Sequence, residues 1–188
     1  MAHTETDCEL RLLTVSDAAA YRALRLESLL HAPEVFEAAY EDQMDKTDDD
    51  CQNFLASNSG IGYFEGSRLV GMVFFCRNPG RKALHRGSIF NFYVTRDYRG
   101  SGVARNLIRV IEAHAKAAKI SQLELYVSSG AKRAIAFYTR VGFEITGRIP
   151  RAIFHDGQHH DFMLMVMTLN PTAPAINADG TARATLDA

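Results

Sequence analysis

The sequence Arg99-Gly100-Ser101-Gly102-Val103-Ala104 lies between two segments with different apolar periodicity. The segment before it, Ile89 to Val94, is rich in β-branched and aromatic residues, as expected for a strand. After it, apolar residues recur at the spacing of one helix face, at Val103, Leu107, Val110, Ile111 and Ala118. The glycines are therefore predicted to end a strand and to open a helix.

The chemistry of such a turn favours phosphate. The first N–H groups of a helix have no intrahelical acceptor, and the helix dipole adds partial positive charge at the same end. Gly100 and Gly102 have no Cβ, so their backbone can approach a phosphate closely. Arg99 and Arg105 can add charge. We therefore predict a pyrophosphate-binding turn, although the two glycines alone leave a strand-to-helix turn without a ligand as an alternative.

A second motif runs from Ala134 to Phe143. It has the pattern of a short helix that ends near Gly142, a residue suited to the C′ position, before Phe143 opens a strand. The motif follows the helix after the glycine turn and the strand expected at 122–127.

The two motifs together closely resemble the GNAT superfamily of acyl-CoA-dependent N-acyltransferases. The resemblance rests on Arg99-x-x-Gly102-x-Ala104, Phe137-Tyr138 and Gly142-Phe143. It extends to the N-terminal part through Leu10 to Thr14, Asp17-Ala18, Leu24-Arg25-Leu26 and Pro33 to Phe36, and covers roughly residues 8 to 169. It implies a mixed α/β fold, with a central, mostly antiparallel sheet that is splayed at its middle and flanked by helices.

Length and composition are consistent with one domain. A chain of 188 residues with 47% hydrophobic residues can build a single core. We expect the N-acetyltransferase domain at residues 1–170. Residues 171–188 are rich in Ala, Thr, Pro, Asp and Gly, which predicts a flexible C-terminal tail.

The remaining elements are predicted from periodicity and turn residues. Ser16 is expected to cap the first helix, and Gly66-Ser67 to join two strands as a hairpin. Strands are expected at 9–13, 60–65, 69–76, 122–127, 143–154 and 162–169, with His155-Asp156-Gly157 as the last turn. Helices are expected at about 17–30 and in pieces between Pro33 and Ser57.

Charge and cysteine usage exclude several classes of protein. A formal net charge of -1 without a basic tract argues against a nucleic-acid partner. The three cysteines fit no disulfide or metal framework, and no segment predicts a signal peptide or a membrane span, so we expect a cytoplasmic protein without a membrane partner. His159, His160 and Asp161 are adjacent and would point to alternating faces of a strand, so no metal site is predicted.

The resemblance also implies a reaction and the residues that serve it. An amine attacks the thioester of acetyl-CoA directly, and Tyr138 stands where the family's general acid faces the coenzyme sulfur. A tyrosine that only packs in the core is the alternative. Backbone N–H groups near Tyr93 or Val94 would stabilise the oxyanion. The expected coenzyme-binding residues are Phe92, Tyr93, Val94, Arg99, Gly100, Ser101, Gly102, Val103, Ala104 and Arg105.

The chain departs from the family pattern at two positions. Asn91 aligns with a glutamate that many members use as a base, and an amide cannot accept a proton at neutral pH. No base is therefore assigned. Deprotonation through water, assisted by one of His85, His155, His159 or Glu124, is compatible with the chemistry. Ala131 replaces an asparagine that contacts the coenzyme, and Ser128 or Ser129 offers a hydroxyl instead.

The acceptor has to be recognised by the less regular segments. Acidic residues between Glu34 and Asp50 could attract a cationic amine, although a solvated helix face explains them as well. Phe36, Tyr40, Phe154 and Phe162 are candidates for an apolar acceptor pocket or for core positions. The leading acceptor is the primary amine of a small molecule or an amino acid. A protein N-terminal or lysine acetyltransferase and a non-catalytic acyl-CoA sensor remain alternatives, and the family's frequent dimers leave a homodimer open.

Overall fold

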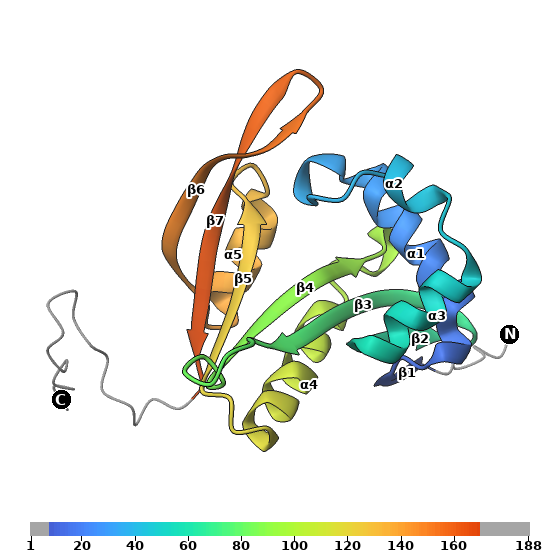
Figure 1. Cartoon of the computed structure of the whole chain (residues 1–188), viewed down its shortest axis with the longest axis horizontal. Coiled ribbons are helices and arrows are strands. Elements are labelled where there is room, and N and C mark those ends of the chain that lie inside the picture. The colour runs from blue at the N-terminus through green and yellow to red at the C-terminus, as the bar shows by residue number, and fades with distance from the viewer. Residues whose placement is uncertain (1–7, 170–188) are drawn as a thin grey trace, which may run out of the picture.

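The computed structural model describes residues 8–169, which form one seven-stranded sheet in the order β1-β2-β3-β4-β5-β7-β6 (Figure 1). The strands are β1 Cys8–Leu12, β2 Ser59–Glu65, β3 Arg68–Arg77, β4 Arg86–Val94, β5 Gln122–Ser128, β6 Glu144–His155 and β7 Gln158–Thr168. The helices are α1 Ala18–His31, α2 Glu41–Met44, α3 Asp48–Ser57, α4 Val103–Ala117 and α5 Lys132–Arg140, with 3-10 turns η1 Val15–Asp17, η2 Pro33–Val35 and η3 Arg96–Tyr98. The tail expected at 171–188 lies outside the described residues.

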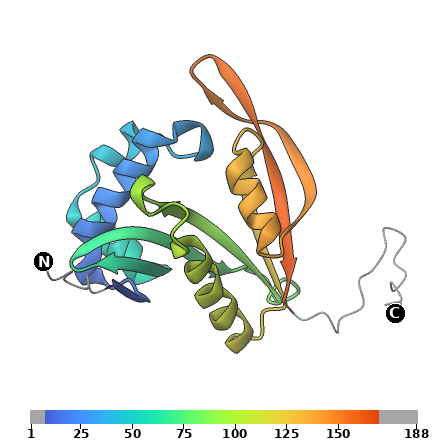
Figure 2. The same cartoon turned by 180° about the vertical axis from the view of Figure 1, so that it is seen from behind.

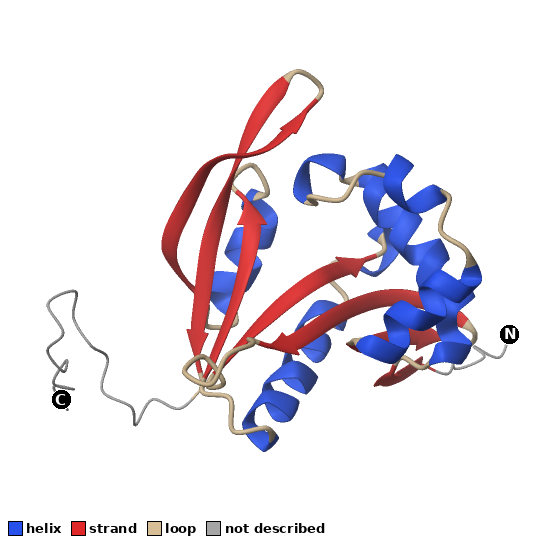
Figure 3. Ribbon diagram, viewed as in Figure 1, coloured by secondary structure: helices blue, strands red, loops and turns tan. Residues whose placement is uncertain are grey.

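The sheet opens between β4 and β5, its parallel pair of strands. These strands are paired only where Arg86–Ser88 meets Gln122–Glu124, and every other pair in the sheet is antiparallel. Beyond Ser88 the two halves of the sheet spread apart, which is visible in the red strands of Figure 3. The expectation of a mixed α/β fold with a splayed, mostly antiparallel sheet is confirmed.

Helices cover both faces of the sheet, and each face has its own core cluster. Figure 1 shows α1 and α3 in front of the first strands, and Figure 2 shows α4 and α5 in front of the opposite face. The side chains of β3 alternate between the two: Met72 and Phe74 pack with α1 and α3, whereas Val73 packs with α4. This alternation follows from the period of two along a strand.

A bulge interrupts β4 near its middle. Phe90 pairs with Phe74 and Tyr93 pairs with Met72, so two residues of β4 stand opposite one residue of β3. One of them is Asn91, whose φ of 48° lies in the left-handed region. A bulge of this kind bends a strand and redirects its side chains.

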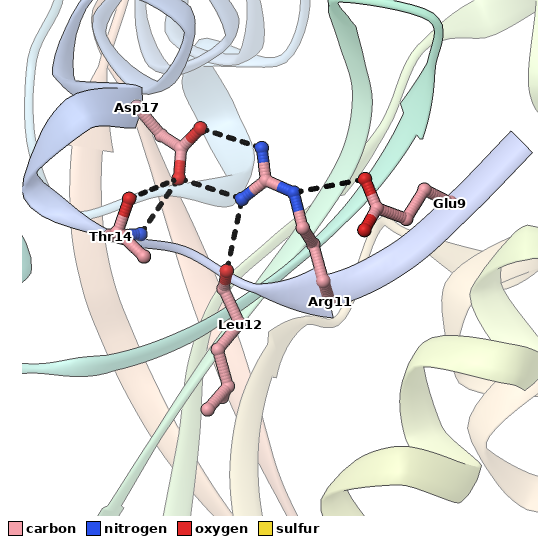
Figure 4. A network of polar contacts seen from close by, with 5 residues as sticks. All are labelled: Glu9, Arg11, Leu12, Thr14 and Asp17. Carbon is pink, nitrogen blue, oxygen red and sulfur yellow. Dashed lines mark hydrogen bonds and ion pairs between the residues drawn. The ribbon is translucent and has the colours of Figure 1, made fainter.

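The start of α1 is fixed to β1 by polar contacts (Figure 4). The Asp17 carboxylate accepts hydrogen bonds from the Thr14 N–H at 2.8 Å and from the Thr14 hydroxyl at 3.0 Å, and both nitrogens of the Arg11 guanidinium fork donate to it at 2.8 Å. Arg11 also donates to Glu9 at 3.1 Å. The prediction that Ser16 caps this helix is wrong, because the contacts at its start are made by Thr14 and Asp17.

Most other local predictions are confirmed. Gly66-Ser67 joins β2 to β3, and Gly142 follows the C-cap of α5 with a φ of 104°. The last hairpin is longer than expected, because the pairing of β6 with β7 continues to His155 and Gln158 and leaves only Asp156 and Gly157 in the turn. Strand β7 therefore begins at Gln158 and not at Phe162.

Candidate active site

The glycine turn lies between the end of β4 and the N-terminus of α4. Gly100 and Gly102 have φ values of 85° and 97°, which non-glycine residues rarely adopt, and Gly102 is the N-cap of α4. No side chain caps this helix, and apart from the adjacent residues no atom of the described chain lies within 4 Å of where a Cβ on either glycine would be. The free N–H groups at the start of α4, among them those of Val103, Ala104 and Arg105, therefore face open space, an arrangement that suits a phosphate.

The polar side chains of the turn differ in what they contact. Arg99 bends back: its Nε donates to the Val94 carbonyl at 3.2 Å and its guanidinium lies 5.6 Å from the Tyr93 ring centre. The Ser101 hydroxyl donates to the Tyr98 carbonyl at 2.6 Å. Arg105 is exposed on the first turn of α4 and has no ion pair within the described residues. Neither arginine forms an ion pair within the described residues, so both charges are free for a ligand, and only Arg99 is held by a hydrogen bond.

The edge of β4 that faces β5 is unpaired beyond Ser88. Backbone groups between Ile89 and Val94 on that side therefore lack a strand partner. The side chains of this segment divide between the two faces. Phe92 lies 5.9 Å from Tyr138 and 6.0 Å from Phe137, whereas the Tyr93 hydroxyl donates to Glu27 on α1 at 3.1 Å. The segment can offer backbone donors to a ligand that lies in the opening.

Tyr138 extends from α5 toward β4. Its ring packs against Phe92, Phe137 and Phe143 at centroid distances of 5.9, 5.4 and 5.7 Å, and 9% of the residue is exposed. Burial raises the pKa of Tyr138 above its ordinary value, so the phenol stays protonated at neutral pH. Its hydroxyl makes no hydrogen bond to the described part of the chain. This position suits a proton donor, and it equally suits a core tyrosine.

Glu124 is not available as a base. Its buried carboxylate accepts hydrogen bonds from Asn78 at 2.5 Å, from the Arg86 Nε at 3.0 Å and from Ser88 at 3.2 Å. Burial alone would raise the pKa of Glu124, but the hydrogen bonds from Asn78 and Arg86 outweigh it and lower that pKa. The residue joins β4 to β5 where the two strands are still paired.

The histidines considered as assistants to a base lie elsewhere. His85 is exposed before β4, and its carbonyl accepts from Ser121 and Gln122. His155 and His159 belong to the last hairpin, where the His159 ring lies 4.8 Å from the Phe154 ring and its Nε2 is 2.6 Å from the Arg151 guanidinium. None of the three lines either of the two cavities described next.

Two cavities lie against the face of β4 that α1 covers. The first, of about 190 Å³, reaches Asn91 at the bulge and is lined also by Arg25, Arg22, Lys46 and Asp50. The second, of about 280 Å³, lies between Glu27, Tyr93 and the start of the glycine turn, and the buried Thr95 hydroxyl in it has no partner among the described residues. Sequence reasoning missed both Arg25 and Glu27 as site residues.

A signal for Arg25 is present in the sequence. The buried residues of α1 include Tyr21, Leu24, Arg25, Ser28 and Leu29, which follow the spacing of one helix face. An arginine on the apolar face of an amphipathic helix is exceptional, because arginine is rarely fully buried without a partner. That position would have marked Arg25 as a candidate site residue.

The other candidates for binding the acceptor or the coenzyme arm do not come together at one site. Of the acidic residues between Glu34 and Asp50, only Asp50 lines either cavity, and its carboxylate accepts from the Thr47 N–H and hydroxyl. Phe36 packs over Arg25, whereas Phe162 is buried and Phe154 is 65% exposed. The Ser128 hydroxyl, at the end of β5, is buried and has no partner in the described part of the chain, whereas the Ser129 N–H donates to the Asp161 carbonyl.

Residues 8–169 contain neither a candidate metal cluster nor a candidate membrane-spanning helix. This part of the chain holds no cluster of three or more His, Cys, Asp or Glu side chains suited to a metal ion. Within the same residues, no helix combines the length and apolar character needed to span a membrane.

Comparisons with known proteins agree with the geometry. Residues 22–143 match the model of the acetyltransferase (GNAT) family. L-methionine sulfoximine/L-methionine sulfone acetyltransferases from Pseudomonas paraeruginosa and Pseudomonas aeruginosa are each 31% identical over 91 residues, which is 48% of this chain and 53% of each relative. The chain thus spans about half the length of the curated relatives it matches.

Solved structures share the fold over most of the chain. A GNAT acetyltransferase from Streptococcus pneumoniae matches with a TM-score of 0.78 and 21% identity, over 86% of this chain and 99% of that one. A Salmonella typhimurium protein solved with its cofactor acetyl-CoA matches with a TM-score of 0.77 and 17% identity, over 92% and 99%. With the family model spanning the glycine turn and Tyr138, the chain belongs to the acetyltransferase (GNAT) family.

Proposed function

We propose that this protein transfers the acetyl group of acetyl-CoA to the primary amine of a small molecule or an amino acid. The observation that carries the proposal is that the unpaired edge of β4 leads directly to the uncapped N-terminus of α4. The first can bind the amides of the coenzyme arm and the second its pyrophosphate. The curated relatives named for L-methionine sulfoximine and L-methionine sulfone support a small amino-acid-like acceptor.

The chain's own residues then have distinct tasks. Bound acetyl-CoA supplies a thioester carbonyl. The N–H groups at the start of α4 hold the pyrophosphate, and the β4 edge near Tyr93 and Val94 orients the acetyl group and donates to its carbonyl oxygen. The amine nitrogen forms the new C–N bond as the C–S bond breaks, and the Tyr138 phenol donates its proton to the leaving thiolate.

The proton on the amine needs a separate path. An alkylammonium has a pKa near 10, so the acceptor has to lose a proton before it attacks. Asn91, at the bulge, cannot accept that proton at neutral pH. We assign the transfer to water in the cavity that Asn91 lines, from which the proton reaches solvent.

The test is acetyl transfer itself. The protein is incubated with acetyl-CoA and a pool of amino acids, polyamines, aminoglycosides and short peptides, and thiol release and product masses are followed together. Amine-dependent acetylation of an amino acid or another small amine is the expected result. Acetylation of peptides alone would replace the proposal with a protein acetyltransferase.

A second candidate is a non-catalytic acyl-CoA sensor, which Asn91 favours because it replaces a basic group with an amide. Such a protein would bind acetyl-CoA in calorimetry, while thiol release would not exceed that of a control without protein for any acceptor. This outcome would overturn the enzyme and leave the coenzyme site in place.

A further inference from the structure

Arg25 carries a buried cation that nothing in the described chain neutralises. It lies on α1 with 6% of the residue exposed, and its Nη1 is fully buried without a hydrogen-bond partner. No other side-chain nitrogen of Arg25 forms a hydrogen bond or an ion pair with residues 8–169. The guanidinium lies 4.9 Å above the Phe36 ring centre and lines the cavity of about 190 Å³ that reaches Asn91.

The other charged groups of this cavity do not compensate Arg25. Arg22 donates to the Met44 and Lys46 carbonyls at 2.6 and 2.9 Å. The Asp50 carboxylate is held by Thr47, and Lys46 adds a further positive charge. Three cations therefore face one carboxylate that is already hydrogen-bonded.

Burial makes such an arrangement costly. Burial lowers the pKa of Arg25, but a guanidinium remains charged at neutral pH because its ordinary pKa exceeds 12. A buried charge without a partner is unfavourable, and a buried charge with a well-placed partner is far less so. The cavity is thus suited to an anion that offers two oxygens to the free nitrogens of Arg25.

We infer that Arg25 binds the carboxylate of the acetyl acceptor, so that the acceptor is an amino acid with a free carboxylate. This inference rests on the proposed function and narrows it. Asn91 lines the same cavity at the β4 bulge, two residues before Tyr93 on the strand assigned to the acetyl group. The cavity is smaller than the roughly 300–1,000 Å³ of pockets for drug-sized ligands, which favours an amino acid over an aminoglycoside.

The alternative is that Arg25 only packs against Phe36 and fixes the segment after α1. The two roles predict different behaviour. If Arg25 only packs, the Arg25→Met variant should be less thermally stable than the parent and should accept the same amines. If Arg25 binds a carboxylate, the same variant without ligand should be at least as stable as the parent, because the substitution removes an uncompensated buried charge.

The experiment compares each accepted amino acid with its own carboxamide. For the parent protein, kcat/KM should be about 100-fold higher for the acid than for the amide, as expected for a buried, charge-assisted pair. In Arg25→Met, kcat/KM should fall about 100-fold for the acid and change little for the amide. In Arg25→Lys, kcat/KM for the acid should lie between these values, because lysine keeps the positive charge but cannot donate two parallel hydrogen bonds as a guanidinium does. Arg109→Met, which removes an exposed arginine from α4 on the opposite face, should preserve the preference.

Calorimetry separates failure of this inference from failure of the proposed function. Amino acids and their amides are titrated into the protein saturated with coenzyme A, in the parent and in Arg25→Met. If no amine is acetylated but acids still bind through Arg25, the enzyme proposal fails and the carboxylate site stands. Equal kcat/KM for acid and amide, an acid preference that survives Arg25→Met, or acid binding that does not depend on Arg25 would each overturn the inference.

Discussion

The two sides of the β4 edge are built by different means. On the side that we propose for the coenzyme, the turn at Gly100 and Gly102 and the open strand edge leave backbone N–H groups free for a ligand. On the side that we propose for the acceptor, the cavity at Asn91 is formed by side chains from α1, α2, α3 and the residues between them. Backbone groups bind what every acyl-CoA has in common, whereas side chains are free to vary with the acceptor.

The two sides also differ in how far apart their residues lie in the sequence. The coenzyme side comes mainly from one continuous segment, 89–105, so its contacts are local. The acceptor side brings together residues 21–54 and Asn91 through the packing of α1 and α3 on β3 and β4. A substitution on one side should therefore leave ligand binding on the other side unchanged, and this independence can be tested.

The largest effect is expected from Tyr138→Phe. Removing the hydroxyl removes the proposed proton donor and leaves the ring packing with Phe92 and Phe143, so kcat should fall by about 100-fold or more while the Kd for acetyl-CoA stays the same. Tyr126→Phe, which alters an exposed tyrosine on β5, is the matched control. Equal turnover by Tyr138→Phe and the parent would exclude Tyr138 as the acid.

The same residue predicts the pH dependence. Because burial raises the pKa of Tyr138 above its ordinary value near 10, the phenol should remain protonated up to about pH 10. The rate should therefore rise with pH as the amine loses its proton and show no decline from Tyr138 below that limit. A fall in kcat between pH 8 and about 9 in the parent, absent in Tyr138→Phe, would contradict the raised pKa of Tyr138, although it would still identify the phenol as the acid.

The Gly102→Glu variant should bind acetyl-CoA more weakly, with no effect on the acceptor side. A carboxylate at the N-cap of α4 would repel the pyrophosphate and occupy the open space before the helix, so the Kd for acetyl-CoA should rise about 30-fold, or ~2 kcal/mol. Gly80→Glu is a matched control, since Gly80 has a φ of 94° and equally open surroundings in the loop before β4. Calorimetry that gives the same Kd for both variants would refute the pyrophosphate-binding turn.

Sequence reasoning succeeded where the structure is local. The glycine turn, the helix that follows it and the C′ glycine at Gly142 are set by neighbouring residues, and all were predicted with the right position. The start of α1 was misassigned because Ser16 has the right residue type, whereas Asp17 is held by Arg11 of β1, a contact between two elements. The end of the last hairpin was misplaced because strand pairing extended it by several residues beyond the apolar pattern.

The acceptor side could not be predicted in the same way. Arg25 and Asn91 lie on different elements, and only the packing of α1 against the sheet places both on one cavity. The acidic residues between Glu34 and Asp50 suggested a site for a cation, but the cavity lined by part of this segment contains mostly positive groups. The charge of this cavity could not be predicted from the segment alone, because Arg22 and Arg25 come from α1. The attraction of a cationic amine by the acidic residues stays a prediction. The homodimer and the cytoplasmic location stay predictions.

A smaller effect, confined to stability, is expected from Asp17→Asn. The hydrogen bonds from Arg11, with those from Thr14, lower the pKa of Asp17 from 3.8 to about 2, which corresponds to about 2 kcal/mol of stability at neutral pH. Because the folded-state pKa is lowered, this stabilisation is complete well above pH 3.8 and is lost as the pH falls toward 2. Urea unfolding should show the difference between parent and variant at pH 6 and its decrease below pH 4.

Asp17→Asn also tests the independence of the two sides. The contacts of Asp17 hold the start of α1, the helix that carries Arg25, whereas the glycine turn lies at the N-terminus of α4. The variant should therefore retain the parent's Kd for acetyl-CoA at neutral pH. A Kd that rises together with the loss of stability would show that the two sides are coupled.

The smallest effect is expected from Glu9→Gln, which removes the other carboxylate bound by Arg11. Glu9 and Arg11 are 3.1 Å apart, but the Glu9 side chain is 61% exposed, whereas that of Asp17 is 10% exposed. Water screens the exposed pair, so unfolding in urea should change by less than about 0.5 kcal/mol and salt should reduce even that. The same guanidinium thus contributes strongly through one carboxylate and weakly through the other, because only Asp17 is buried and shared with Thr14. Equal losses in Glu9→Gln and Asp17→Asn would mean that the charge of Arg11, and not the geometry at the start of α1, fixes this helix to β1.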